Sequence, residues 1–175
     1  MSELVRREKR CILFDLMADP KFEDWGVIVD NCKDLVKLAT KTERFNIRVQ
    51  FDEVERFDFI CSLTLRKPHG LEVLPDTCIA VDEISSFCSP YYMPKYFGGL
   101  IRLGRHSNAR FIGTTQRPPD INPLILSQAK EWYLFQMHLP RDVEYLKKFV
   151  PEIDKVRTLK IGEYILWTPE AKTLE

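Results

Sequence analysis

Two adjacent carboxylates close a short apolar run. Residues 78–81 are Cys-Ile-Ala-Val, and Asp82 and Glu83 follow directly. An uninterrupted apolar run of this length is typical of a strand buried on both faces of a parallel sheet. In such sheets ligands bind beyond the carboxyl ends of the strands, so the two acids would lie where chemistry is expected. The alternative for this stretch alone is a strand that reaches the surface and ends in two solvated acids.

A second polar stretch follows another short apolar run. Residues 111–113 precede a polar segment that includes Gln116 and Arg117, and two prolines then forbid a continued strand. Arg105 lies upstream, in the tripeptide Gly-Arg-His. Gln116 would therefore stand at the tip of its strand, as the acid pair does at the tip of the strand before it.

The elements that would position these residues alternate along the chain. Residues 46–51 alternate Ile47 and Val49 with Arg48, the period of a half-buried strand with Arg48 on its polar face. The predicted strands are residues 11–14, 27–29, 46–51, 78–81, 111–113 and 132–137, with a terminal hairpin of 156–159 and 164–167. The predicted helices are residues 31–41, capped by Asp30 or Asn31, 52–67, capped by Asp52, 95–107, 123–130 and 141–149. Such alternation implies an α/β fold, a mostly parallel sheet with helices on both faces.

Length and composition restrict the classes of function. The 175 residues predict a single domain, and 26 basic against 26 acidic residues provide no overall positive field for a nucleic acid. Any nucleic-acid contact would therefore use a local patch. Five cysteines without a C-x-x-C pair indicate reduced thiols in a cytosolic protein, and three dispersed histidines offer no metal cage. No apolar run approaches the roughly 20 residues that span a bilayer.

The order of the two polar stretches resembles the HerA/FtsK-type branch of the P-loop ATPases. That branch includes DNA-pumping translocases, viral genome-packaging ATPases and the zonula-occludens-toxin-like ATPases of filamentous phages. The resemblance runs from about Lys9 to Trp167, and its most specific part is the acidic strand end followed by GRHSNARFIGTTQRP. It implies a RecA-like core, ATP and Mg²⁺ as cofactors, a homo-oligomeric ring that acts on DNA, and a virus-encoded origin.

The resemblance assigns a role to each polar residue. Asp82 would occupy the Walker B position and hold Mg²⁺ through water, and Glu83 would be the general base that orients the attacking water. Gln116 would be the sensor that contacts the γ-phosphate or the water. Arg105 and Arg117 are both candidates for a finger that reaches a neighbouring subunit's site, a contribution of roughly 10³–10⁵ in rate. Otherwise Glu83 is a helix-capping acid, Gln116 a turn residue, and both arginines surface charges.

One element of the family is missing from the sequence. A G-x-x-x-x-G-K-[ST] loop requires glycine before lysine, and none of the seven glycines precedes a lysine. In the family that loop precedes the strand matched here by residues 11–14. The chain, 1–175, therefore resembles a truncated core without its first strand and without the loop that cradles phosphates. Because loss of a central strand would leave buried backbone groups unpaired, we expect a repositioned strand, a partner chain or another copy to fill the gap.

Three functions remain open from the sequence. The first is an ATPase-type motor domain for DNA packaging or translocation, a fragment or one half of a split enzyme that needs a partner bearing the loop. The second is a catalytically inactive ATPase-like scaffold that binds a partner. The third and weakest is a metal-dependent nuclease that uses Asp82 with Asp15. For the motor, the aromatic loop of residues 86–96 is a candidate contact for nucleic acid, and the alternative is a loop that packs on its own domain.

Overall fold

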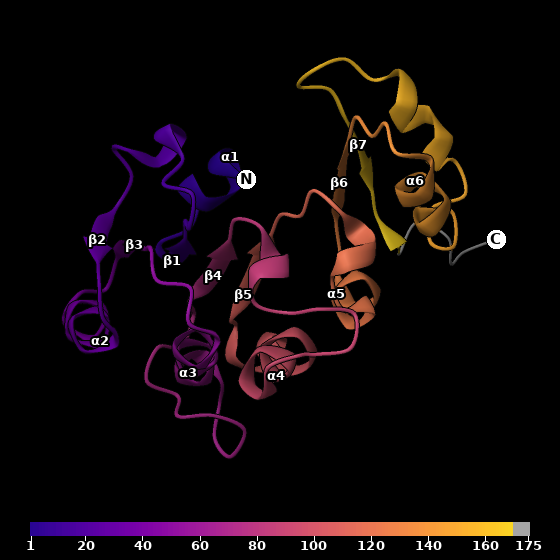
Figure 1. Cartoon of the computed structure of the whole chain (residues 1–175). Helices are drawn as coiled ribbons and strands as arrows, with labels where there is room; N and C mark the ends of the chain where they lie inside the picture. Colours follow the sequence, from indigo (N-terminus) through magenta and orange to yellow (C-terminus); the bar gives the residue numbers. More distant parts are fainter. Residues whose placement is uncertain (170–175) are drawn as a thin grey trace. The chain divides into compact units, whose positions relative to one another are not determined.

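The structure is a computed structural model that describes residues 1–169. The chain forms two compact units, the first comprising Met1–Gln116 and the second beginning at Arg117 (Figure 1). The expectation of a single domain stays a prediction. The first unit contains α1 (Ser2–Arg6), β1 (Arg10–Phe14), η1 (Pro20–Phe22), β2 (Val27–Val29), α2 (Cys32–Lys41), β3 (Phe45–Val49), α3 (Val54–Thr64), β4 (Cys78–Val81), η2 (Ile84–Ser86), α4 (Lys95–Leu103), η3 (Gly104–Ser107) and β5 (Arg110–Gly113). The second contains η4 (Pro118–Asp120), α5 (Pro123–Gln128), β6 (Trp132–Phe135), α6 (Pro140–Leu146), η5 (Ile153–Thr158) and β7 (Tyr164–Trp167).

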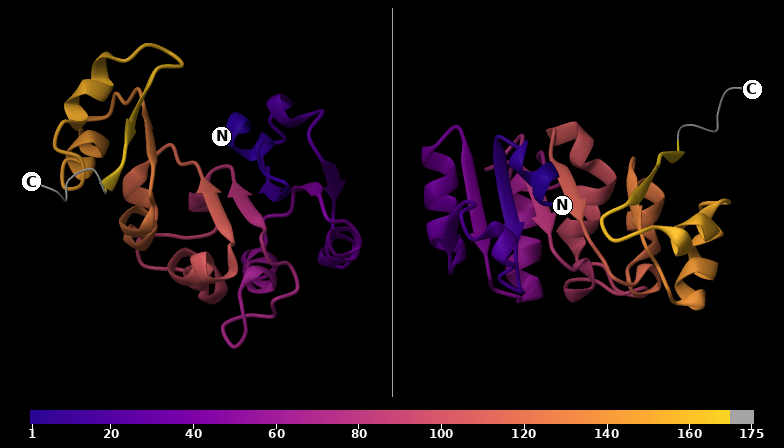
Figure 2. Two further views of the ribbon diagram at one scale, coloured as in Figure 1. Left: turned by 180° about the vertical axis from the view of Figure 1, so that it is seen from behind. Right: turned by 90° about the horizontal axis from the view of Figure 1, so that it is seen from above.

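A five-stranded parallel sheet is the framework of the first unit. Its strand order is β2-β3-β1-β4-β5, and each neighbouring pair is parallel. Phe14 pairs with Val81, and Val81 pairs with Gly113, so β1, β4 and β5 end level with one another. Figure 2 shows these strands from behind and from above. The predicted α/β fold with a mostly parallel sheet is confirmed.

Helices cover both faces of this sheet. Cys11 and Leu13 of β1 join a core cluster with Val5 of α1. Phe14 faces the other way and packs edge-on against Phe57 of α3, with ring centroids 5.0 Å apart. Figure 1 accordingly shows α1 on one side of the sheet and α2, α3 and α4 on the other. Burial on both faces explains why β1 and β4 are continuous apolar runs in the sequence.

The expected gap inside the sheet is not observed. The five strands pair consecutively from β2 to β5. In the part of the chain that the structure describes, each interior strand of this sheet therefore has a paired neighbour on both sides. That part of the prediction is wrong, because β1 and β4 pair directly along their length. A further strand could therefore pair with this sheet only along an outer edge, at β2 or at β5.

Two helix starts test the capping predictions. Asn31 caps α2, since its side chain accepts a hydrogen bond from the Asp34 amide at 2.9 Å. Asp52 does not cap α3, which begins one residue later with Glu53 at the N-cap and no side-chain cap bond. The predicted helix of residues 95–107 also divides into α4 and the 3-10 helix η3.

An antiparallel pair of strands, β6 and β7, organises the second unit. The C-terminal antiparallel pair is confirmed, but its predicted first strand is wrong. Residues 156–158 are the last three residues of η5, and residue 159 follows that helix. Tyr164–Trp167 pairs with Trp132–Phe135 instead. Trp132 and Leu134 are buried in one cluster with residues of α6 and η5. This shared apolar face, rather than closeness in sequence, selects the strand partner.

Candidate functional site

The carboxyl ends of β4 and β5 bring the acid pair beside Thr114. The Thr114 hydroxyl donates a hydrogen bond to Asp82 Oδ1 at 2.7 Å and accepts one from the Glu83 amide at 3.2 Å. The backbone continues this connection, because the Ile84 amide donates to the Thr114 carbonyl at 2.8 Å. One hydroxyl therefore links both acidic residues to the neighbouring strand and holds Asp82 in a single orientation.

The Glu83 carboxylate accepts hydrogen bonds from both sides. Its Oε1 accepts from the Ser85 hydroxyl at 2.6 Å and from the Thr115 hydroxyl at 3.1 Å. Its Oε2 accepts from the Gln116 amide at 3.0 Å. Bonds to an ionised acceptor are stronger than neutral ones, so this carboxylate is preorganised at the strand end.

The backbone of Glu83 adopts a conformation that side chains rarely take. Its φ is +62° and its ψ is +79°, in the left-handed region. A residue other than glycine meets a steric cost of about 1–2 kcal/mol there. Such outliers persist when their surroundings hold them, and they concentrate at functional sites. The bonds to Thr114, Ser85 and Gln116 are the surroundings that hold this one.

The structure brings Asp82, Glu83 and Gln116 to the same end of the sheet, as expected. Gln116 meets the acid pair through its backbone amide, while Gln116 as a residue is exposed. The predicted chemical roles of these three residues stay predictions. Sequence reasoning missed Thr114, although its place directly after a predicted strand next to an acid pair was the available signal.

A cavity of about 210 Å³ adjoins Asp82, whereas one of about 310 Å³ lies elsewhere. The smaller cavity is lined by Asp82 and Thr114 together with residues of the chain's first turn and of the β1–β2 loop: Met1, Ser2, Asp19, Lys21 and Phe22. Mg²⁺ keeps several waters and binds proteins through one or two carboxylates plus substrate phosphates. The two carboxylates on the cavity wall, Asp82 and Asp19, fit that manner of binding.

A buried ion pair supports the loop beside this cavity. Asp15 directly follows β1 and is fully buried, and its Oδ2 lies 2.7 Å from Arg48 Nη2 on β3. Arg48 also donates to the Phe22 carbonyl at 2.6 Å. The prediction that Arg48 occupies a solvent-facing side is therefore wrong, because only 4% of its side chain is exposed. Alternation alone could not reveal that an acid on the adjacent strand accepts this arginine.

The two candidate finger arginines have different surroundings. Arg105 lies in η3, before β5, and is exposed, so it stands at the amino end of the sheet, away from Asp82. Arg117 begins the second unit and pairs with Asp120 at 3.3 Å and with Asp142 at 3.8 Å. Asp142 has only 5% of its side chain exposed, so Arg117 serves a structural ion pair within that unit.

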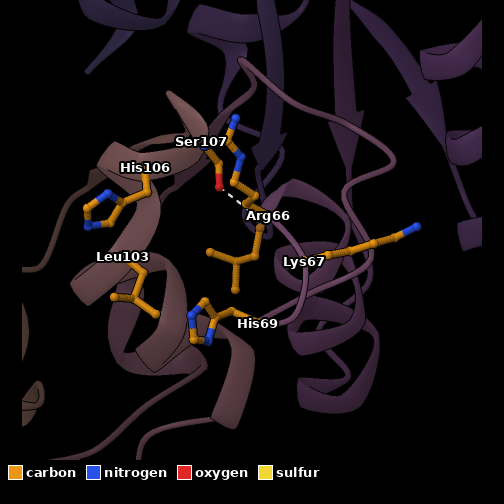
Figure 3. Close-up of a pocket in the computed structure, with 7 residues that line it drawn as sticks. Arg66, Lys67, His69, Leu103, His106 and Ser107 are labelled. Atoms are coloured by element: carbon orange, nitrogen blue, oxygen red, sulfur yellow. Dashed lines mark hydrogen bonds between the residues drawn. The ribbon is translucent and has the colours of Figure 1, made fainter.

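The larger cavity occupies the amino end of the sheet. It is lined by Leu65, Arg66, Lys67, His69, Leu103, His106 and Ser107. Figure 3 shows the imidazoles of His69 and His106 on either side of Leu103, with the Lys67 side chain directed away. The Arg66 amide donates to the Ser107 hydroxyl at 2.7 Å and ties the two walls together (Figure 3). None of the described residues that line this cavity is a carboxylate, in contrast to the cavity beside Asp82.

The aromatic loop divides into buried and exposed parts. Phe87 is buried and stacks on Phe57 with centroids 4.2 Å apart. Tyr91 is 99% exposed and Tyr92 is 54% exposed, at a turn closed by two hydrogen bonds between the backbones of Ser89 and Tyr92. The expectation that the loop packs on its own domain thus applies to its first part, and the turn presents tyrosine to solvent.

Metal, membrane and thiol features are limited in the described residues. Among residues 1–169, no group of three or more His, Cys, Asp or Glu side chains could hold a metal ion. In the same range, no helix is long and apolar enough to cross a membrane. Cys11, Cys32, Cys61 and Cys78 are free thiols. A side-chain hydrogen bond with Cys78, followed by burial, raises the pKa of Cys11, and burial raises the pKa of Cys61.

The fold of this chain is similar to that of solved viral genome-packaging ATPases. Among solved structures, the genome packaging NTPase B204 from Sulfolobus turreted icosahedral virus 2 in complex with sulfate matches with a TM-score of 0.77 and 18% identity, covering 100% of this chain and 84% of that one. Its complex with AMPPCP gives 0.76 and 18%, covering 99% and 85%. The DNA-packaging ATPase B204 from Sulfolobus Turreted Icosahedral Virus gives 0.71 and 17%, also covering 99% and 85%. No family model matches the chain, and no curated protein matches its sequence.

Proposed function

We propose that this chain is an ATPase-type motor domain for DNA packaging or translocation. The observation that carries the proposal is the connected set of Asp82, Glu83 and Thr114 at level strand tips. A scaffold without chemistry has no need of a carboxylate on a strained backbone held by three donors. The likeness to B204, whose solved complexes include ATP-gammaS and AMPPCP, supports the choice of nucleotide.

The roles of the side chains follow from their positions. Asp82 would hold Mg²⁺ through water, and the ion would neutralise charge on the phosphates when bound. Glu83 accepts a proton from, and orients, the attacking water, with Ser85 and Thr115 fixing its carboxylate. Gln116 is fixed at its amide, so its side chain can extend toward the phosphate that reacts.

We propose that a partner subunit supplies the phosphate-binding loop. The strand that carries this loop would pair at an outer edge of the sheet, because the inner strands are fully paired. Nucleotide binding by this chain alone is therefore weak, and its activity depends on that loop. The likeness to B204, a viral protein, supports the proposal of a virus-encoded motor that works in the cytoplasm of an infected cell.

Arg105 is the better candidate for the finger. It is exposed at the amino end of the sheet, so it can reach only another subunit's Asp82 site. Arg117 is engaged by Asp120 and the buried Asp142. A finger that acts between copies requires a ring, in which one surface of each copy meets a different surface of the next.

The tyrosine turn is the proposed contact for DNA. Tyr91 and Tyr92 are presented on a turn whose backbone is already ordered by the Ser89 bonds. Lys95 follows at the start of α4 and lies over the Tyr96 ring, 5.1 Å from its centroid. Aromatic stacking and lysine–phosphate contacts are the usual means of holding a nucleic-acid strand without reading its sequence.

The decisive experiment measures DNA-stimulated ATP hydrolysis by the chain together with the segment that carries a phosphate-binding loop. Wild-type protein should hydrolyse ATP, and Glu83→Gln should lower the rate by roughly 10²–10⁴ while leaving the circular dichroism spectrum unchanged. Activity that survives Glu83→Gln would reject the assigned base. Absence of hydrolysis and of nucleotide binding in the wild-type assembly would favour the inactive scaffold.

A further inference from the structure

The wall of the Asp82 cavity carries a lysine to which the family resemblance assigns no role. Lys21 lies in η1, and it lines the same cavity as Asp82 and Thr114. Its side chain is 76% exposed, with Nζ 4.0 Å from Asp19 Oδ2, so the ammonium can move within reach of a ligand. Lysine is a compact point charge suited to phosphate oxygens.

A sequence of hydrogen bonds fixes the backbone that carries this lysine. The Lys21 amide donates to Asp19 Oδ1 at 2.9 Å, and the Asp19 amide donates to Asp15 Oδ1 at 2.9 Å. Asp15 in turn is held by Arg48 at 2.7 Å inside the sheet. The buried pair thus acts through Asp19 on the position of Lys21. Arg48 reinforces the same loop by donating to the Phe22 carbonyl, one residue beyond.

The charges around the cavity define what it can bind. Asp82 and Asp19 are acidic and Lys21 is basic, so the walls combine oxygen donors for a cation with an ammonium for an anion. A magnesium–polyphosphate complex presents both kinds of charge in one ligand. The two carboxylates would repel a free anion, and the ammonium would repel a free cation. A ligand that carries both charges is therefore favoured.

We infer that Lys21 binds a phosphate oxygen of the magnesium–nucleotide complex held at Asp82, and that the Asp15–Arg48 pair is the positioning element for it. The inference rests on the nucleotide chemistry proposed above. It places a cationic contact for the phosphates on this chain itself, in the segment between β1 and β2.

The test is a titration of the ¹⁵N-labelled full chain with MgATP and, in parallel, with magnesium tripolyphosphate at millimolar concentrations. Both ligands should shift the amides of Asp19, Lys21, Asp82 and Thr114. Lys21→Ala should weaken both affinities about tenfold, the value of one charge-assisted contact, and Lys21→Arg should restore most of the loss. The Asp19 bond survives in both variants because its donor is the backbone of residue 21.

Lys41→Ala is the matched control. Lys41 is an exposed lysine at the end of α2, at the opposite end of the sheet, and its loss should leave both affinities unchanged. Three results would each overturn the assignment of Lys21. They are equal affinities for the two alanine variants, amide shifts that cluster away from Asp82, and no amide shifts in the wild type. Glu83-dependent hydrolysis with an unaltered Lys21→Ala affinity would reject only that assignment and would leave the motor function standing.

Discussion

The two ends of the five-stranded sheet differ in both charge and connection. The carboxyl end gathers Asp15, Asp82 and Glu83, and each accepts at least one hydrogen bond from a neighbouring segment. The amino end gathers Arg66, Lys67, His69, Arg105 and His106, and these residues are exposed. The chain has no net charge, yet these two groups of opposite charge lie at opposite ends of the strands.

This difference shows how one sheet can supply two kinds of site. Acids that are oriented by donors suit chemistry in which a fixed group must meet a reacting atom. Exposed bases on short helical turns suit contact with the charge of another molecule, where steering matters more than exact placement. A neighbouring copy in a ring would bring the basic end of one subunit to the acidic end of the next.

The largest effect is expected from breaking the contact between opposite ends. Arg105→Ala should lower ATP hydrolysis by the assembled protein about 10³-fold or more, because a charge at the transition state is lost. Its free energy of unfolding should hardly change, since no ion pair holds Arg105 within residues 1–169.

Mixing two inactive variants checks that the contact joins different copies. Equal amounts of Arg105→Ala and Glu83→Gln protein should recover part of the activity, because some interfaces then contain both intact residues. Arg102→Ala, an exposed arginine on the preceding helix, is the control and should remain active. No recovery on mixing would mean that Arg105 serves its own subunit or none.

The next effect concerns stability at the acidic end. Arg48→Met should lower the free energy of unfolding by about 3–5 kcal/mol, because it leaves the buried Asp15 carboxylate without its partner. Arg56→Met removes an ion pair whose side chains are 45% and 44% exposed, and should cost less than about 1 kcal/mol. Urea denaturation of both variants measures the difference, and similar losses would show that the Asp15 pair is not a buried support.

A smaller effect is expected from the hydroxyl that joins the two strand tips. Thr114→Val should cost about 1–3 kcal/mol, because the Glu83 amide and Asp82 lose a partner in a partly buried site. Thr158→Val removes an exposed bond to the Lys155 carbonyl and should be nearly neutral. Thermal unfolding compares them, and a neutral Thr114→Val would show that water replaces the hydroxyl without loss.

The smallest expected effect concerns the alkylation rates of the thiols, which report how tightly each cysteine is packed. Cys32 is the thiol that is not fully buried, whereas the other four are buried. Burial raises the pKa of Cys32 as well, so at mildly alkaline pH it should alkylate slowly, and the others should react only after unfolding. Peptide mass spectrometry after iodoacetamide treatment gives the order. Rapid labelling of Cys11 or Cys78 in the native protein would contradict the closed packing of β1 on β4.

The sequence predicted the positions of the acid pair and of Gln116 where strong local signals existed, and the roles of these residues stay predictions. Residues 78–81 form a continuous apolar run, which only a strand buried on both faces explains well, and Asp82 and Glu83 lie at its end. Gln116 was placed correctly at the tip of the next strand, because Pro118 and Pro119 limit how far β5 can extend.

Features that depend on distant partners were not predictable in this way. Arg48 looked solvent-facing because its acceptor, Asp15, is 33 residues away. The partner of β7 was missed because 156–159 contains apolar residues and lies close to β7 in the sequence. The packing of Trp132 and Leu134 with α6 selects 132–135 instead. Lys21 stood in a segment broken by a proline, where spacing carries no information on what the loop faces.

The left-handed backbone at Glu83 and the hydrogen bonds of its carboxylate have opposite consequences for stability. Glycine would occupy that conformation without steric cost, but Glu83→Gly would also leave the Ser85, Thr115 and Gln116 donors without their acceptor. The three bonds therefore offset the backbone strain, and glutamate at this position keeps a carboxylate in place before any ligand arrives.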